Sequence, residues 1–108
     1  MLMEHENCPC METCPLNRAM ALIGGKWKMQ ILCSLYNNGP TRYNQLKKAL
    51  DGVSNTVLAN ALRELEGDGL VHRQEYLEVP VRVEYAITEP CRQLIPIVDA
   101  LGDWSMAL

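Results

Sequence analysis

The chain has 108 residues, of which 48% are hydrophobic and 21% charged, as in a single soluble globular domain. No apolar run approaches the roughly 20 residues of a membrane-spanning helix, and the acidic N-terminus lacks the apolar segment of a secretory signal. Its five cysteines, an odd number, do not suit a secreted disulfide scaffold. We therefore expect a cytoplasmic protein that does not associate with membranes.

The net charge of −3 is unevenly distributed along the chain. Residues 17–50 contain six basic and no acidic side chains, whereas residues 51–108 contain four basic and ten acidic ones. Such an asymmetry is typical of a basic binding face on an acidic body. A chance excess of lysine and arginine in a solvated segment would give the same pattern, so the charge alone does not decide between the two.

The N-terminal part of the chain predicts an arm and two helices. Residues 1–13 have no hydrophobic period, so we expect an arm there and one domain over residues 14–108. Pro15 suits the first turn of a helix, which Gly24 and Gly25 end. The run KWKMQILCSLY then predicts a second helix with one apolar face, and NNGP ends it.

A pair of helices separated by a tight turn follows. Thr41 is suited to cap the first helix of the pair, and Asp51 and Gly52 break it. Ser54 is suited to cap the second helix, which has apolar residues at helical spacing. These inward positions are Leu58, Leu62 and Leu65.

The C-terminal part predicts a β-hairpin and a last helix. The segments Leu70–Tyr76 and Arg82–Ile87 alternate and contain Val, Tyr and Ile, as strands do. The intervening residues form the tip of the hairpin. Thr88 and Pro90 begin the last helix, and we expect Pro96 to kink or split it.

The order of these elements predicts a fold. A tight turn lets the second helix of a pair project into the major groove of DNA, and a hairpin behind it forms a wing. We therefore predict an α+β, mainly helical, winged helix-turn-helix with a two-stranded β-wing.

Four runs of sequence carry a more specific resemblance. CPLNRAMALIGGKWKMQIL, VSNTVLANALRELEGDGLVHR, VPVRVEYAIT and DALGDW resemble, in order and spacing, the HxlR-type branch of the MarR-like winged-helix regulators. The resemblance extends from Cys14 to Trp104. It implies a transcription regulator without enzymatic activity, expected to be a repressor. It further implies a homodimer held by its N- and C-terminal helices, with two recognition helices on an inverted-repeat operator in double-stranded DNA.

The last helix independently favours a dimer. Its apolar side is too extensive to remain exposed on a domain of this size. The residues on that side are Leu94, Ile97, Val98, Leu101 and Trp104.

Side chains suited to DNA lie on the predicted helix pair and the wing. Arginine, asparagine and threonine bind base edges or phosphates, and a helix N-terminus favours a phosphate. The candidate DNA-binding residues are Arg42, Lys47, Lys48, Ser54, Asn55, Thr56, Asn60, Arg63 and Arg82. In the recognition helix, Arg63 is the one positive charge, and Glu64 and Glu66 follow it. This low basic content leaves open a winged-helix interaction module that does not bind DNA.

Three cysteines near the N-terminus, Cys8, Cys10 and Cys14, form the pattern C-x-C-x3-C. Cys14 directly precedes Pro15, where a helix N-terminus stabilises a reactive thiolate. We expect Cys14 to sense an oxidant or a small electrophile, with Cys8 or Cys10 as the resolving thiol of a disulfide. The alternative is that Cys14 is a small buried hydrophobic residue.

Metal binding is a competing use of the same segment. His5 together with the three cysteines would supply four ligands of zinc type, which keeps a metal-responsive regulator as an alternative. Because the spacing lacks the C-x2-C of a zinc knuckle, we assign no metal site and no cofactor. A thiol oxidoreductase is disfavoured, since the sequence has no C-x-x-C pair.

Overall fold

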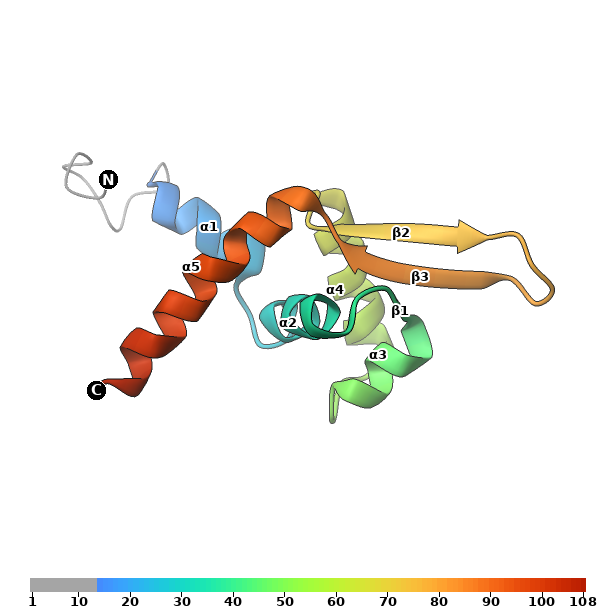
Figure 1. Cartoon of the computed structure of the whole chain (residues 1–108), viewed down its shortest axis with the longest axis horizontal. Coiled ribbons are helices and arrows are strands. Elements are labelled where there is room, and N and C mark those ends of the chain that lie inside the picture. Colours follow the sequence, from blue (N-terminus) through green and yellow to red (C-terminus); the bar gives the residue numbers. More distant parts are fainter. Residues whose placement is uncertain (1–13) are drawn as a thin grey trace.

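The computed structural model describes residues 14–108, and these form five helices and three strands (Figure 1). The mainly helical α+β winged helix-turn-helix predicted from the sequence is confirmed. In chain order the elements are α1 (Pro15–Ile23), α2 (Lys28–Asn38), β1 (Thr41–Arg42), α3 (Tyr43–Ala49), α4 (Asn55–Gly67), β2 (Val71–Tyr76), β3 (Arg82–Ile87) and α5 (Glu89–Met106).

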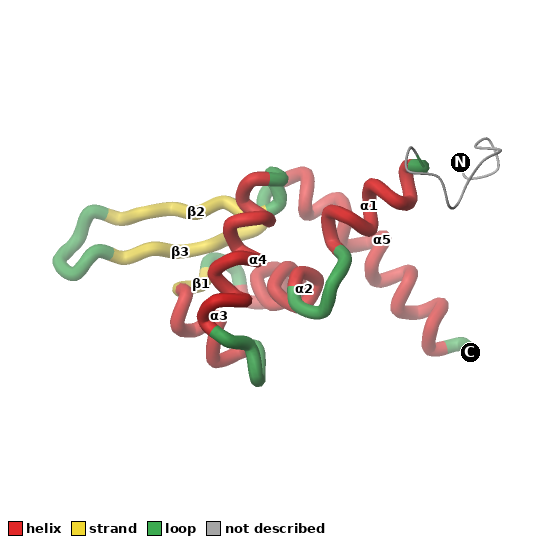
Figure 2. The backbone as a smooth tube through the Cα atoms, turned by 180° about the vertical axis from the view of Figure 1, so that it is seen from behind, coloured by secondary structure: helices red, strands yellow, loops and turns green. Residues whose placement is uncertain are grey.

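The strands form an antiparallel sheet in the order β1-β3-β2. The predicted wing is the β2–β3 hairpin, in which Val71 pairs with Ile87 and Tyr76 with Arg82. The hairpin extends away from the helices (Figures 1 and 2). The short strand β1 joins it, with Thr41 opposite Tyr85, so the sheet has three strands where two were predicted.

The prediction that Thr41 caps the third helix is wrong. Thr41 lies in β1, is 7% exposed, and donates a hydrogen bond from Oγ1 to the carbonyl oxygen of Gly39 at 2.7 Å. Arg42 is the N-cap of α3, and its backbone N–H donates to Oε1 of Gln45 at 3.2 Å. Pairing with β3 keeps the threonine extended, and the helix therefore begins at Tyr43, one residue later than predicted.

The core is built mainly from leucine and isoleucine of α2, α3 and α4, with contributions from the sheet and the first turns of α5. The predicted inward residues of α4 are confirmed, since each is at most 2% exposed. Full burial of one such side chain contributes about 1.5–3 kcal/mol. The largest fully buried side chains are Ile31, Leu32, Leu35, Leu46, Leu58, Leu62, Leu65 and Cys91.

The turn between α3 and α4 agrees with the sequence pattern. Gly52 has a φ of 86°, a left-handed conformation that other residues rarely adopt. Ser54 is the N-cap of α4, as predicted, and its Oγ accepts a hydrogen bond from the Val57 N–H at 3.1 Å. The two residues fix where α4 begins.

Helix α5 is continuous from Glu89 to Met106, so Pro96 does not split it. Pro96 and Arg92 are both exposed, and solvent can satisfy the Arg92 carbonyl that lacks its helical partner. The helix begins where the sequence predicts, and Thr88 caps it by accepting from the Cys91 N–H at 3.4 Å. The same hydroxyl donates to the Gly69 carbonyl at 2.6 Å, which ties the start of α5 to the end of α4.

The two halves of α5 differ in their surroundings. Cys91 and Ile95 are buried in the domain, whereas the C-terminal half projects away from it at the end opposite the wing (Figure 1). Four exposed apolar residues recur at helical spacing along this half and just beyond its end, and we call them the α5 apolar face. They are Ile97, Leu101, Trp104 and Leu108. None of the helices in residues 14–108 combines the length and apolar character that a membrane span requires.

An ion pair joins α2 to α4. The Lys28 Nζ lies 2.7 Å from Oε1 of Glu64, and the lysine side chain is the more buried partner. The hydrogen bond from Lys28, and then its charge, hold the pKa of Glu64 below its ordinary value. The negative charge that follows Arg63 in the recognition helix is therefore balanced within the domain.

This ion pair predicts a stability that depends on pH. A carboxyl whose pKa is lowered by folding stabilises the protein above its ordinary pKa of 4.5, and this contribution is lost as the pH falls through the folded-state pKa. We expect Glu64→Gln to be less stable than the wild type at pH near 6, and the difference to shrink on acidification to about pH 3. Urea denaturation at several pH values measures it. Glu66→Gln, an exposed change in the same helix, is the control, and the same pH dependence in both variants would contradict the prediction.

Candidate DNA-binding interface

A tyrosine hydroxyl connects the two helices of the helix-turn-helix. The Tyr43 hydroxyl of α3 lies 3.2 Å from both the backbone oxygen and the Oδ1 of Asn55 in the first turn of α4, and donates to either of them. This contact fixes the N-terminus of α4 against α3. Nothing local in the sequence singles out Tyr43, because its partner is twelve residues away.

Helix α4 exposes a polar side opposite its buried leucines. Asn55, Thr56, Asn60 and Arg63 are all exposed and recur at helical spacing; we call them the α4 polar face. The Arg63 guanidinium donates from Nη2 to Oδ1 of Asn60, so two of the predicted residues are brought into contact. Such side chains are suited to base edges.

The N-terminus of α4 is suited to a phosphate. Its first turn contains no acidic residue, and unpaired backbone N–H groups at a helix start attract anions. The Ser54 hydroxyl is engaged as an acceptor in the cap, which leaves its proton available for a phosphate oxygen.

The basic candidates of the neighbouring segment lie at both ends of α3. Arg42 precedes the helix, and Lys47 and Lys48 lie in its last turn. Among residues 14–108, no carboxylate forms an ion pair with any of the three. Their positive charges thus remain uncompensated by the described part of the chain.

Arg82 has a different environment. Its Nη2 lies 3.0 Å from Oε2 of Glu78 and its Nη1 lies 3.8 Å from Oε2 of Glu84. The guanidinium carbon also lies 4.0 Å from the centre of the Tyr76 ring, and the side chain is 27% exposed. Two carboxylates and a ring therefore hold Arg82 along the hairpin, and its charge is less available than that of Arg63.

The cysteine predictions divide between described and undescribed residues. Cys14 is the N-cap of α1 as expected, but it is 2% exposed, and its carbonyl accepts from the Arg18 N–H at 3.2 Å. The predicted resolving thiols Cys8 and Cys10, and His5 of the metal alternative, lie outside the described residues. Within residues 14–108, no group of three His, Cys, Asp or Glu side chains could hold a metal ion.

Two other cysteines are Cys33 of α2 and Cys91 of α5. Burial, and secondarily Asp99, raise the pKa of Cys33. Burial also raises the pKa of Cys91, partly opposed by Arg92. Raised pKa values keep both thiols protonated and make them poor nucleophiles.

A helix-turn-helix with an exposed polar helix face, a β-wing and an apolar terminal helix defines a winged helix-turn-helix transcription regulator. Residues 22–108 match the family described as HxlR-like helix-turn-helix, and the chain belongs to this family. This confirms the resemblance inferred from the sequence runs. Regulators of this kind bind DNA, typically as dimers.

Similar proteins are described as HTH-type transcriptional regulators. The chain is 41% identical over 92 residues to the HTH-type transcriptional regulator BH0655 of Halalkalibacterium halodurans, covering 85% of this chain and 81% of that protein. It is 41% identical over 93 residues to YdzF of Bacillus subtilis, covering 86% and 85%.

Solved structures of redox-related regulators are similar as well. The redox regulator HypR in its oxidized form has a TM-score of 0.79 at 38% identity, covering 88% of this chain and 97% of that one. The reduced form of the transcriptional regulator YodB from B. subtilis has a TM-score of 0.79 at 32% identity, covering 86% and 91%.

The contact between α3 and α4 predicts the effect of removing one hydroxyl. Tyr43→Phe keeps the ring but loses the hydrogen bond to Asn55, and we expect the free energy of unfolding to fall by about 0.5–1.5 kcal/mol. Urea denaturation measures this change. Tyr36→Phe, at an exposed tyrosine of α2, is the matched control and should leave stability nearly unchanged. Equal stability of both variants would mean that the contact contributes nothing.

Proposed function

We propose that the chain is a sequence-specific DNA-binding regulator of the cytoplasm, acting as a repressor and not as an enzyme. The observation that carries the proposal is the α4 polar face, held in a fixed direction by a capped N-terminus and by Tyr43. In a winged helix-turn-helix this helix enters the major groove, where asparagine and arginine side chains read base edges.

The α5 apolar face supports the proposal that the protein is a homodimer. Its helical members are 59 to 65% exposed in the single chain, a large apolar surface for a domain of this size. A twofold dimer buries the same face on both copies. It presents two copies of α4 to the half-sites of an inverted repeat in double-stranded DNA, about 34 Å apart.

The other candidates complete the proposed contact. Arg42, Lys47 and Lys48 would bind phosphates on either side of the groove, since the described residues leave their charges unbalanced. Arg82 would reach a phosphate or the minor groove only after its ion pair with Glu78 breaks. We therefore assign Arg63 the larger part in recognition.

The test of this proposal is DNA binding by two variants. Arg63→Ala should weaken binding to the promoter region beside the protein's own gene by about 1–3 kcal/mol and change the sequence preference. Arg82→Ala should have a smaller effect that is uniform across sequences, as expected of a phosphate contact. Fluorescence anisotropy at several salt concentrations measures both.

Arg92→Ala, an exposed change on α5, is the control for loss of a positive charge. A salt-dependent, sequence-specific interaction that only Arg63→Ala and Arg82→Ala weaken would support the proposal. Absence of such binding in the wild type would favour a winged-helix interaction module. Unchanged affinity in both variants would contradict the roles proposed for Arg63 and Arg82 in DNA binding.

We propose in addition that Cys14 makes the regulator sensitive to an oxidant or a small electrophile. The support is its position at the start of α1, where a helix N-terminus favours a thiolate, and the similarity to the redox regulator HypR. Because Cys14 is only 2% exposed, reagents would reach it when the first turn of α1 opens. An oxidant would remove two hydrogens, one from Cys14 and one from Cys8 or Cys10, to form a disulfide.

Diamide treatment tests the role of Cys14. We expect it to change the DNA affinity of the wild type and to leave that of Cys14→Ser unchanged, as measured by fluorescence anisotropy. Cys33→Ser is the matched control, because the raised pKa of Cys33 makes it a poor thiolate and the variant should respond like the wild type. If the wild type does not respond, or Cys14→Ser responds equally, Cys14 is structural.

A further inference from the structure

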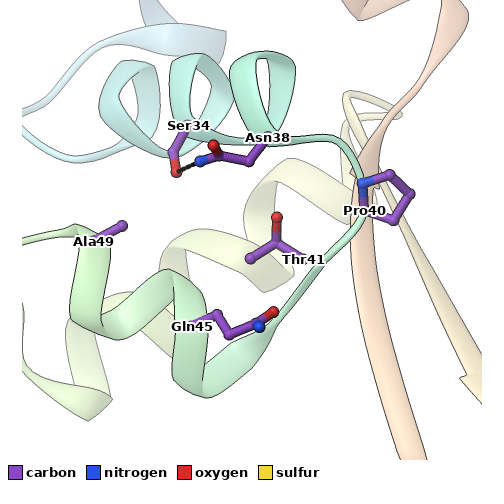
Figure 3. Close-up of a pocket in the computed structure, with 6 residues that line it drawn as sticks. All are labelled: Ser34, Asn38, Pro40, Thr41, Gln45 and Ala49. Carbon is purple, nitrogen blue, oxygen red and sulfur yellow. Dashed lines mark hydrogen bonds between the residues drawn. The ribbon is translucent and has the colours of Figure 1, made fainter.

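A pocket of about 330 Å³ lies between α2, β1 and α3 (Figure 3). Its volume is at the lower end of the range of small-molecule sites, about 300–1,000 Å³. Side chains of all three elements line it, together with Pro40 of the turn before β1. The lining residues are Ser34, Asn38, Pro40, Thr41, Gln45 and Ala49.

The polar side chains of this pocket are held in place by bonds within the domain. Asn38 donates from Nδ2 to Oγ of Ser34 at 3.4 Å, and Thr41 donates from Oγ1 to the Gly39 carbonyl at 2.7 Å. Gln45 accepts at Oε1 from the Arg42 N–H at 3.2 Å. Each of the two side-chain amides therefore has one partner within the domain.

The same bonds leave hydrogen-bonding capacity on the pocket wall. Among the described residues, the Oδ1 of Asn38 has no donor and the Nε2 of Gln45 has no acceptor. The Ser34 hydroxyl accepts from Asn38 and keeps its proton to donate. The pocket therefore offers an amide oxygen as an acceptor, and an amide nitrogen and a hydroxyl as donors.

The lining contains no ionisable side chain. An ionised group on a ligand would thus gain no counter-charge from the lining side chains. Pro40 and Ala49 add apolar surface beside the polar groups, as is usual in sites for small molecules. The chemistry of the lining favours an uncharged ligand that both donates and accepts hydrogen bonds.

The position of the pocket connects it to the recognition helix. Gln45 and Ala49 lie one turn apart on α3, whereas Tyr43 of the same helix contacts Asn55 at the start of α4. The pocket shares no residue with the candidate DNA-binding set. A ligand between α2 and α3 would therefore act on α4 through α3 and leave the DNA-contacting side chains uncovered.

We propose that this pocket binds an uncharged, hydrogen-bonding small molecule, of the size of a nucleobase or a monosaccharide, as an effector that shifts α3 and thereby α4. The regulatory part rests on the proposed DNA-binding function, whereas the binding part does not.

The experiment uses the full chain without DNA. Uracil and glucose serve as uncharged probes at millimolar concentration, and orotate and glucose 6-phosphate as their charged counterparts. We expect at least one uncharged probe, and neither charged one, to shift the amide NMR resonances of Ser34, Asn38, Thr41 and Gln45. A response to uracil would identify the ligand class as planar bases, and a response to glucose would identify it as polyols.

Ala49→Leu tests whether the shifts arise from the pocket. The larger side chain fills space from an exposed helix position where leucine is well tolerated, and we expect the affinity of the active probe to fall at least about tenfold. Ala107→Leu, beyond the end of α5, is the control and should bind normally. Binding unaffected by Ala49→Leu, or no response to either uncharged probe, would overturn the proposal even if the protein binds DNA.

Discussion

The packing of α4 is the constraint on which the other features depend. One side of this helix is buried against α2 and β2 by three leucines and Ala61. Because an α-helix repeats every 3.6 residues, burial of that side determines which side chains face outward. The α4 polar face is therefore set by the same contacts that stabilise the domain, and Ser54 and Tyr43 determine where its first turn lies.

Internal ion pairs determine how a chain of net negative charge presents itself to DNA. Glu64 is paired with Lys28, which balances an acid next to Arg63. Arg82 is instead paired with carboxylates of its own hairpin. The pairing of charges therefore describes the interface better than their number in the sequence. Among the described residues, it leaves Arg63 and the basic residues of α3 without an acidic partner, whereas it neutralises Arg82 on the wing.

The sequence predicts those features whose causes are local. Gly52 and Ser54 specify the turn before α4 by backbone and capping preferences, and both are found as expected. The role of Thr41 was not predictable in this way, because a partner 44 residues away, Tyr85, keeps it extended in a sheet. The contact of Tyr43 likewise depends on how separate segments pack, whereas the carboxylates paired with Arg82 lie within four residues of it in the sequence.

The double use of the Thr88 hydroxyl has a mechanical consequence. Its bond to the Gly69 carbonyl, and the backbone bonds from Thr88 N to Leu70 O and from Leu70 N to Leu65 O, link the end of α4, the base of the hairpin and the start of α5. These three elements are thus joined at one point, from which α5 projects away from the domain (Figure 1). A displacement of α5 would therefore act directly on the end of α4 and the base of the hairpin, because these hydrogen bonds attach the helix there.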